Sequence, residues 1–258
     1  MTDGSNTRHI VVKPDAEAAA RYVADLFCNI LCQAVGGRGA CRVALAGGTT
    51  PRPLYSVLAD RAMDAEMPWQ QVEFFFSDER DVPQDDVDSN YGMVQRLLLD
   101  HLPVPVVQVH PMPADSEDLD AAAADYENTV RQRVPAGPEG IPRFDVILLG
   151  MGADGHVASL FPGLESLKED RRLVVASFVP RLGRSRMTFT FPLINAARHV
   201  ILMVTGEDKA DAVAGVLTQD EPSQTNLPAS GVRPAGGDLY VALDAAAARE
   251  ANLQDTSG

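Results

Sequence analysis

The sequence has few cysteines, no long apolar run and no leader-like start, and each shortage excludes a class of protein. Its 258 residues include three cysteines and no C-x-x-C pair, which argues against a disulfide framework or a cysteine metal site. We expect Cys28 and Cys32, four residues apart on a predicted helix, to be small buried apolar residues. No apolar run reaches 18 residues and no signal sequence opens the chain, so we predict a cytoplasmic protein without membrane contacts.

Basic residues are also scarce, and this limits the possible partners. The formal net charge of −14 argues against a general surface for nucleic acid, because such a surface needs a basic footprint. An anionic ligand would therefore have to meet a local cationic pocket. The length and the 45% hydrophobic content fit one domain over residues 1–258, with flexible ends at about 1–7 and 252–258. We predict a monomer and leave a weak dimer open.

Apolar periodicity predicts strands and helices that alternate along the chain. We expect strands at 9–12, 42–46, 72–76, 104–109, 144–149, 173–177, 187–191, 199–204 and 239–243, and helices at 16–34, 54–58, 89–99, 119–130 and 206–217. Gly36 and Gly37 are expected to end the first helix. This alternation is typical of an open, mostly parallel α/β sheet, in which ligands bind at the carboxyl ends of the strands.

The most informative stretch is FDVILLGMGADGHVASLFPG at residues 144–163, a buried strand that breaks into glycines and then presents His156. Gly150, Gly152 and Gly155 match the dinucleotide-binding pattern G-x-G-x-x-G. That pattern normally opens a long helix, whereas the Phe-Pro-Gly turn at 161–163 leaves room for about two helical turns. We therefore predict no nicotinamide cofactor, and the sequence calls for no other cofactor.

A second glycine loop follows the strand at 42–46. Gly47 and Gly48 precede Thr49, which is suited to cap a helix, and Pro51, which is suited to its first position. A strand, a glycine loop and a helix start together offer backbone N–H groups to an anion. No Gly-Lys-Ser/Thr follows, so a nucleoside triphosphate is not expected. The alternative is an ordinary strand-to-helix turn with a good cap.

Charged residues follow other predicted strands. Asp78 and Arg80 come directly after the strand at 72–76, where a solvated acidic loop is the usual explanation. Both residues would nevertheless lie near the neighbouring glycine loop. Arg186 stands among basic residues in an acidic chain, and Lys209 lies at a helix start, where a cation is unfavourable unless an anion is also present.

These motifs together resemble the 6-phosphogluconolactonase family. The resemblance rests on GGTTP at 47–51, SDERDVP and SNY within 77–91, GMGADGHVASLFPG at 150–163, RMTFT at 186–190, GEDKA at 206–210 and LPAS at 227–230. It implies a three-layer α/β/α fold with a Rossmann-like sheet, similar to glucosamine-6-phosphate deaminase and ribose-5-phosphate isomerase. It also implies hydrolysis of 6-phospho-glucono-1,5-lactone in the pentose phosphate pathway, without a cofactor. Thr49 stands where the family often has serine, and both side chains carry a hydroxyl.

Opening a cyclic ester needs a base for water, donors for the oxyanion and an acid for the leaving oxygen. We assign the base to His156, since a histidine can take and return a proton near neutral pH. Either Asp154 or Asp78 would orient it, and Arg80 would serve either the phosphate or the lactone oxygen. The phosphate would be bound by Gly47, Gly48, Thr49, Arg186 and Lys209.

Two other functions fit the same fold. One is an aldose-ketose isomerase or deaminase acting on an amino-sugar phosphate, but the deaminases that the chain resembles have a tyrosine after the Asp-Glu pair, where this chain has Arg80. The other is a non-catalytic sugar-phosphate sensor, for which the acidic chain offers no DNA-binding segment. A covalent serine mechanism is also disfavoured, because no G-x-S-x-G motif exists and Ser159 is placed one predicted helical turn after His156.

Overall fold

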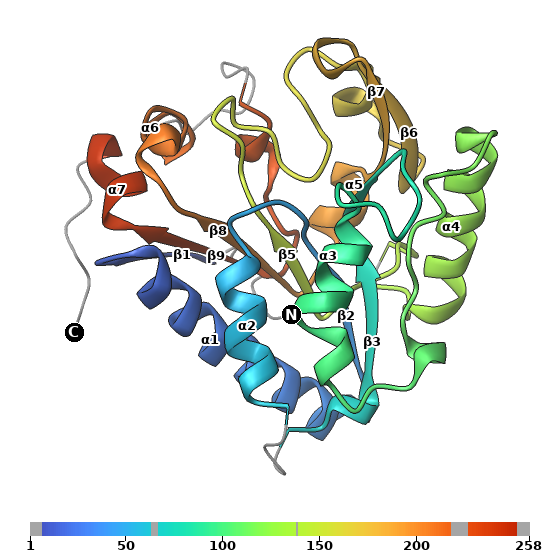
Figure 1. Ribbon diagram of the computed structural model, residues 1–258, viewed down its shortest axis with the longest axis horizontal. Helices are drawn as coiled ribbons and strands as arrows, with labels where there is room; N and C mark the ends of the chain where they lie inside the picture. Colours follow the sequence, from blue (N-terminus) through green and yellow to red (C-terminus); the bar gives the residue numbers. More distant parts are fainter. Residues whose placement is uncertain (1–6, 63–66, 138, 218–226, 252–258) are drawn as a thin grey trace.

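A computed structural model describes residues 7–62, 67–137, 139–217 and 227–251. The predicted flexible ends lie almost entirely outside this part of the chain. Its main feature is a six-stranded, fully parallel sheet in the order β1-β9-β8-β5-β2-β3 (Figure 1). The strands are β1 (Thr7–Lys13), β2 (Cys41–Leu45), β3 (Val72–Phe76), β5 (Val146–Leu149), β8 (His199–Val204) and β9 (Asp238–Asp244). The central strands are buried on both faces, as their continuous apolar runs predict.

The order of the strands creates a crevice at the middle of the sheet. From β2 the chain moves to β3 on one side, whereas β5 and β8 lie on the other side of β2. The connections that leave the carboxyl ends of β2 and β5 therefore run in opposite directions. Such a switch point is where open α/β sheets bind ligands, and the two glycine loops of the sequence follow these two strands.

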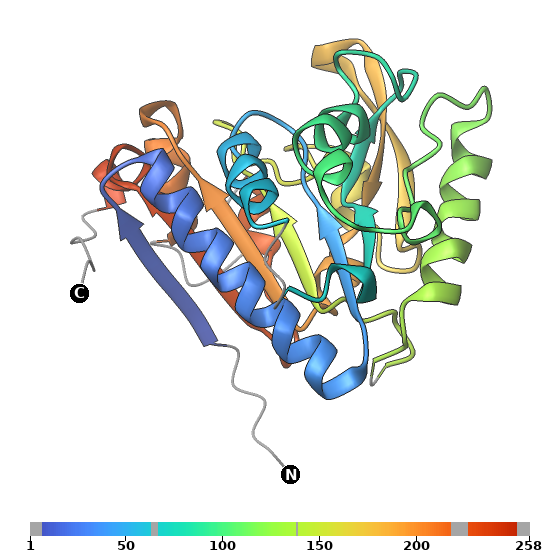
Figure 2. The ribbon, with the colours of Figure 1, turned by 60° about the horizontal axis from the view of Figure 1, so that its bottom comes forward.

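Helices flank the sheet, which confirms the expected mostly parallel α/β fold. The helices are α1 (Ala16–Arg38), α2 (Arg52–Asp60), α3 (Asn90–Leu97), α4 (Leu119–Arg133), α5 (Phe191–Asn195), α6 (Ala210–Leu217) and α7 (Ala245–Ala248). Packing joins α1 to α2 and α2 to α3, and Figure 2 shows α1 lying along the sheet beside β1. None of the described helices is long and apolar enough to cross a membrane.

The first helix is longer than the sequence predicted. Gly36 and Gly37 do not end it, because both keep helical geometry and the helix continues to Arg38. Gly39 ends it instead, in the left-handed conformation with φ 76°, and its N–H donates to the carbonyl of Val35. A glycine stops a helix only where the chain needs this conformation, and the sequence alone does not show which of three nearby glycines adopts it.

A second, antiparallel sheet in the order β4-β7-β6 stands beside the main one. It consists of β4 (Asp78–Arg80), β6 (Val174–Val179) and β7 (Arg184–Phe189), and α4 packs against β6. The charged segment after β3 is therefore a short strand rather than a solvated loop. This places Asp78 and Arg80 directly opposite β7, where Arg80 pairs with Arg186 in the register.

Three local predictions were wrong. Residues 104–109 form no strand: Val106–Gln108 is a 3-10 turn, and Val109 alone bridges to β3, because prolines at 103 and 105 remove backbone donors. Thr49 does not cap α2 with its side chain; its carbonyl accepts from Arg52, and the helix begins one residue after Pro51. Cys28 is buried as expected, but Cys32 is exposed, and both are free thiols.

Candidate active site

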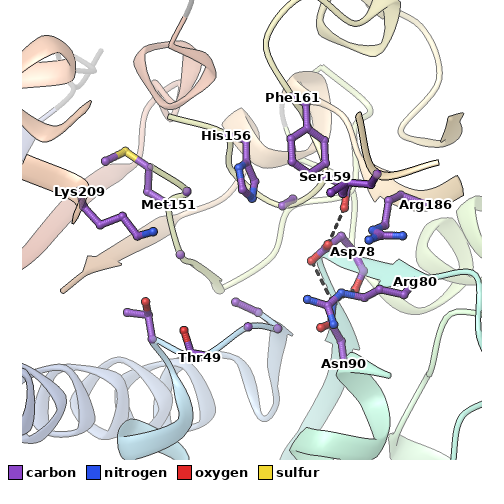
Figure 3. A pocket seen from close by; sticks show the side chains of 18 of the residues that line it. Thr49, Asp78, Arg80, Asn90, Met151, His156, Ser159, Phe161, Arg186 and Lys209 are labelled. Atoms are coloured by element: carbon purple, nitrogen blue, oxygen red, sulfur yellow. Dashed lines mark hydrogen bonds between the residues drawn. The ribbon is translucent and has the colours of Figure 1, made fainter. Parts of the chain in front are cut away.

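A cavity of about 330 Å³ opens at the switch point of the main sheet (Figure 3). Loops after β2 and β5 line it, together with residues from β4, α3 and β7 and from the turns before β7 and α6. The predicted site residues that line it are Gly47, Gly48, Thr49, Asp78, Arg80, His156, Arg186 and Lys209. Asp154 contacts His156 but does not line this cavity; it lines a neighbouring surface hollow instead. The structure thus gathers at one cavity residues that are up to 162 positions apart in the sequence.

A histidine–aspartate pair forms the wall of this cavity. His156 Nδ1 lies 2.5 Å from Asp154 Oδ1. An ionised carboxylate only accepts hydrogen bonds, so Nδ1 carries the proton and Nε2 remains an acceptor when the ring is neutral. Burial raises the pKa of Asp154, but the hydrogen bond and charge of His156 and the charge of Arg181 outweigh it, so this pKa lies below its ordinary value. The pair thus fixes the orientation of the His156 ring.

The glycine loop shapes the space around the pair. A Cβ on Gly152 would lie 2.0 Å from His156 Nδ1 and 2.6 Å from Asp154 Oδ1, so only glycine fits there. Gly155 turns the chain with φ 76°, and Ala158 also has a positive φ, 47°. No helix forms between residues 150 and 164, where we expected up to two turns. The loop thus lacks the long helix of a dinucleotide site, which agrees with the rejection of that pattern.

Two residues that we did not assign from the sequence complete this wall. The ring of Phe161 lies 4.2 Å from that of His156, between ring centres. Arg181 places one guanidinium nitrogen 2.5 Å from Asp154 Oδ2 and stacks its guanidinium 4.6 Å above the Phe161 ring. Phe161 belongs to the motif at 150–163, and Arg181 belongs to a loop rich in basic residues. Neither observation predicted a place beside His156.

Asp78 makes different contacts from those considered for it. Its Oδ2 accepts a hydrogen bond of 2.7 Å from Ser159 Oγ, and its Oδ1 lies 3.3 Å from Asn90 Nδ2 (Figure 3). All three side chains are buried. Of the two candidates for orienting His156, Asp154 makes the contact. Ser159 lies in a turn rather than a helix, and its hydroxyl is held by Asp78.

Glu79 is a buried carboxylate that joins β4 to the start of α3, and nothing in the sequence singled it out. Its carboxylate is 2% exposed and accepts from the backbone N–H groups of Arg80, Asn90 and Tyr91 and from Ser89 Oγ. Burial raises the pKa of Glu79, although these backbone hydrogen bonds act in the opposite sense. A carboxylate at the start of α3 also suits the positive end of the helix.

The cations of the cavity lie on two sides of it. Figure 3 shows Lys209 near Thr49 on one side of His156, and Arg186 near Arg80 on the opposite side. Burial, followed by the charge of Arg80, lowers the pKa of Arg186, whose Nη1 lies 3.7 Å from Asp81 Oδ1. Lys209 Nζ lies 2.8 Å from Asp208 Oδ2. Both residues line the cavity, on opposite sides of His156 in this view, and their assignment to one phosphate stays a prediction.

The described residues offer no ready set of metal ligands. Among the described residues, no three histidine, cysteine, aspartate or glutamate side chains are grouped so that they could hold a metal ion. The cavity residues that could hold a ligand are instead cations, hydroxyls and backbone N–H groups of the glycine loop. This chemistry is suited to a phosphorylated, hydroxyl-rich compound.

Comparison with known proteins shows which family this chain belongs to. Residues 14–241 match the family of glucosamine-6-phosphate isomerases/6-phosphogluconolactonase. The chain belongs to this family. It is 37% identical over 246 residues to a 6-phosphogluconolactonase of Nostoc sp., an alignment that covers 95% of this chain and 98% of the relative. It is 38% identical over 227 residues to that of Mycobacterium tuberculosis, covering 86% and 90%. The resemblance inferred from the motifs is confirmed.

Solved structures agree with this family membership. The 6-phosphogluconolactonase of Trypanosoma brucei superposes with a TM-score of 0.83 at 29% identity, covering 95% of this chain and 99% of that one. A monomeric glucosamine-6-phosphate deaminase superposes with a TM-score of 0.78 at 20% identity, covering 94% and 99%. At that identity the second match shows a shared fold, as the sequence predicted, and nothing about the reaction.

Proposed function

We propose that the chain hydrolyses 6-phospho-D-glucono-1,5-lactone to 6-phospho-D-gluconate. Its relatives in Nostoc and Mycobacterium tuberculosis carry the name 6-phosphogluconolactonase, and their alignments extend over most of each chain. The observation that carries the proposal is the His156–Asp154 pair in the wall of a cavity with cations on both sides. Such a site can activate water beside a phosphorylated ester.

In this mechanism His156 acts first as a base and then as an acid. Nε2 takes a proton from water while the water oxygen attacks the lactone carbonyl carbon. Negative charge develops on the carbonyl oxygen, where Arg80 or backbone N–H groups of the glycine loops stabilise it. As the bond between this carbon and the ring oxygen breaks, Nε2 returns the proton to the ring oxygen. The product is a carboxylic acid, which ionises in water. Asp154 keeps the imidazole in one tautomer and orientation.

The cavity offers two alternative sets of residues for binding the phosphate. One is the glycine loop of Gly47, Gly48 and Thr49 with Lys209, which combines backbone N–H groups with a cation. The other is Arg186 beside Arg80, which offers planar guanidinium groups suited to a phosphate. Whichever group takes the phosphate, the other faces the lactone end of the substrate. Our assignment of Arg80 to either role therefore stays open.

The test is proton release from freshly prepared 6-phosphogluconolactone in weak buffer, with and without the protein. The lactone also opens spontaneously, so the rate without protein is subtracted. We expect a protein-dependent rate that is proportional to enzyme concentration, and no ammonia release from glucosamine 6-phosphate. A lactone rate equal to the spontaneous one would refute the proposal, and ammonia release would favour the deaminase alternative.

Other features of the molecule remain predictions. These are the single domain over residues 1–258, the monomeric state, the cytoplasmic location, the pathway and the absence of nucleic-acid partners. Reaction without a cofactor also belongs here. Light scattering would test the monomer, and activity after treatment with a chelator would test the metal-free reaction.

A further inference from the structure

Arg181 contacts Asp154 and Phe161, the two side chains that also contact His156. It lies in the 3-10 turn Pro180–Leu182, which connects β6 to β7 in the small sheet. Asp154 and His156 instead follow β5 of the main sheet. Arg181, like Phe161, lines both the active-site cavity and the neighbouring hollow that Asp154 lines, so it forms part of the wall between them.

The first contact of Arg181 is an ion pair with the Asp154 carboxylate. Asp154 Oδ1 is 2.5 Å from the histidine, and Asp154 Oδ2 is 2.5 Å from the Arg181 guanidinium. Each carboxylate oxygen thus has its own partner, a hydrogen bond at Oδ1 and an ion pair at Oδ2. A carboxylate held at both oxygens cannot rotate without losing one of these interactions. The charge of Arg181 also favours the ionised form of Asp154.

The second contact of Arg181 is with the ring of Phe161, which lies beside His156. The Arg181 guanidinium lies 4.6 Å above the centre of the Phe161 ring, within the range of a cation–π interaction. The same ring lies 4.2 Å from the centre of the His156 ring. Arg181 is therefore connected to the imidazole by two routes, one through Asp154 and one through Phe161, and it makes no direct hydrogen bond to it among the described contacts.

We propose that Arg181 is a positioning residue of the hydrolysis, which holds His156 in its reactive orientation by clamping Asp154 and Phe161. This inference rests on the proposed lactonase function. Since the side chain of Arg181 is 51% exposed, its contribution to overall stability is modest, and its main effect falls on the groups that it touches. A shift of the base by about 1 Å is enough to lower a catalysed rate about a hundredfold.

The experiment compares Arg181→Met, which removes the charge, with Arg181→Lys, which keeps a charge but not the planar guanidinium. The matched control is Arg184→Met. Arg184 is also about half exposed and belongs to the same hairpin, but its ion pairs are with Asp81 and Asp88. Kinetics are measured on freshly prepared 6-phosphogluconolactone, and circular dichroism with thermal melting checks that each variant is folded.

We expect Arg181→Met to lower kcat about ten- to a hundredfold, the loss that follows when a reactive group is misplaced by up to about 1 Å. KM should stay within about threefold of the wild-type value. Arg181→Lys should recover part of kcat, and Arg184→Met should match the wild type. In the Asp154→Asn background, Arg181→Met should cause a much smaller loss, because one of its two routes to His156 is already impaired.

Three results would overturn this role. A raised KM with unchanged kcat would make Arg181 a substrate-binding residue. Losses that multiply fully in the double variant would mean that Arg181 acts independently of Asp154. Equal losses for Arg181→Met and Arg184→Met would point to a general effect of the hairpin. If Arg181→Met does not fold, the same comparisons apply to Arg181→Lys. Failure of the lactonase function itself is recognised separately, since the wild-type protein would then show no activity.

Discussion

Replacing Gly152 by alanine is the sharpest test of the His156–Asp154 pair. The new Cβ would lie 2.0 Å from His156 Nδ1 and 2.1 Å from Cε1, whereas an ordinary contact begins near 3.4 Å. The imidazole must therefore withdraw by about 1.4 Å, or the loop must move by a similar amount. Either change breaks the present hydrogen bond of 2.5 Å to Asp154. The substitution adds one methyl group and alters no chemical function.

The magnitude follows from this displacement. A misplacement of about 1 Å costs roughly 10²-fold in rate, or about 2.7 kcal/mol in the activation free energy. The loss cannot exceed the whole contribution of a general base, which is about 10²- to 10⁴-fold. We therefore expect Gly152→Ala to lower kcat by at least about 10²-fold. In the His156→Ala background the same substitution should have little further effect, because the displaced group is absent.

The assay is proton release from 6-phosphogluconolactone, corrected for spontaneous opening. The matched control is Gly150→Ala on the same loop, since a Cβ at Gly150 meets no atom within 4 Å. This control should keep kcat within about threefold, and any contact of its methyl group with the substrate should appear in KM. A folded Gly152→Ala protein with kcat within threefold of the wild type would refute the assigned geometry.

Four further predictions use the same assay. His156→Ala should lower the rate by about 10²- to 10⁴-fold while the fold survives, and an unchanged rate would remove its role as base. Asp154→Asn should lower kcat by about ten- to a thousandfold, with KM as the control, because the orienting charge is lost. Lys209→Met should lower kcat/KM about ten- to a hundredfold on the phosphorylated lactone but hardly on unphosphorylated gluconolactone; if Arg186→Met shows this selectivity instead, the phosphate binds at the other side. Exhaustive dialysis against a chelator should leave the rate unchanged, and restoration of lost activity by one divalent metal would contradict this.

The sequence predicted those parts of the fold that depend on local pattern. Apolar runs identify the buried parallel strands, and the 3.6-residue period identifies the long helices, because each signal comes from burial of one element. The errors occur where the same local sequence pattern is compatible with two structures. Gly36, Gly37 and Gly39 are all able to end a helix, and only the structure shows that Gly39 does so. The valines at 104–109 favour a strand, but Pro103 before them and Pro105 among them remove donors that pairing needs.

The candidate site was predictable to the extent that its residues belong to recognisable motifs at strand ends. His156, Asp78 and the loop at 47–49 were expected at one edge of the sheet, and the cavity gathers them there. Which acid contacts His156 could not be derived, since Asp154 and Asp78 both follow parallel strands. The distance between Lys209 and Arg186 was also beyond the sequence, because it depends on how the small sheet sits beside the main one.

The cavity lies where the two sheets meet, and this explains both its chemistry and the limits of sequence reasoning. The main sheet supplies the glycine loops and His156, whereas the small sheet supplies Arg80, Arg186 and, at its turn, Arg181. Hydrogen bonds join the two parts, since the Ser159 hydroxyl donates to Asp78 and its N–H donates to the hydroxyl of Thr188. A parallel sheet offers backbone N–H groups and loops at its carboxyl edge, but its buried strands have little room for charge. An added antiparallel hairpin can carry several arginines to that edge while its backbone stays paired. The electrostatics of the site are therefore set by the contact between the sheets, a property that no local pattern in the chain encodes.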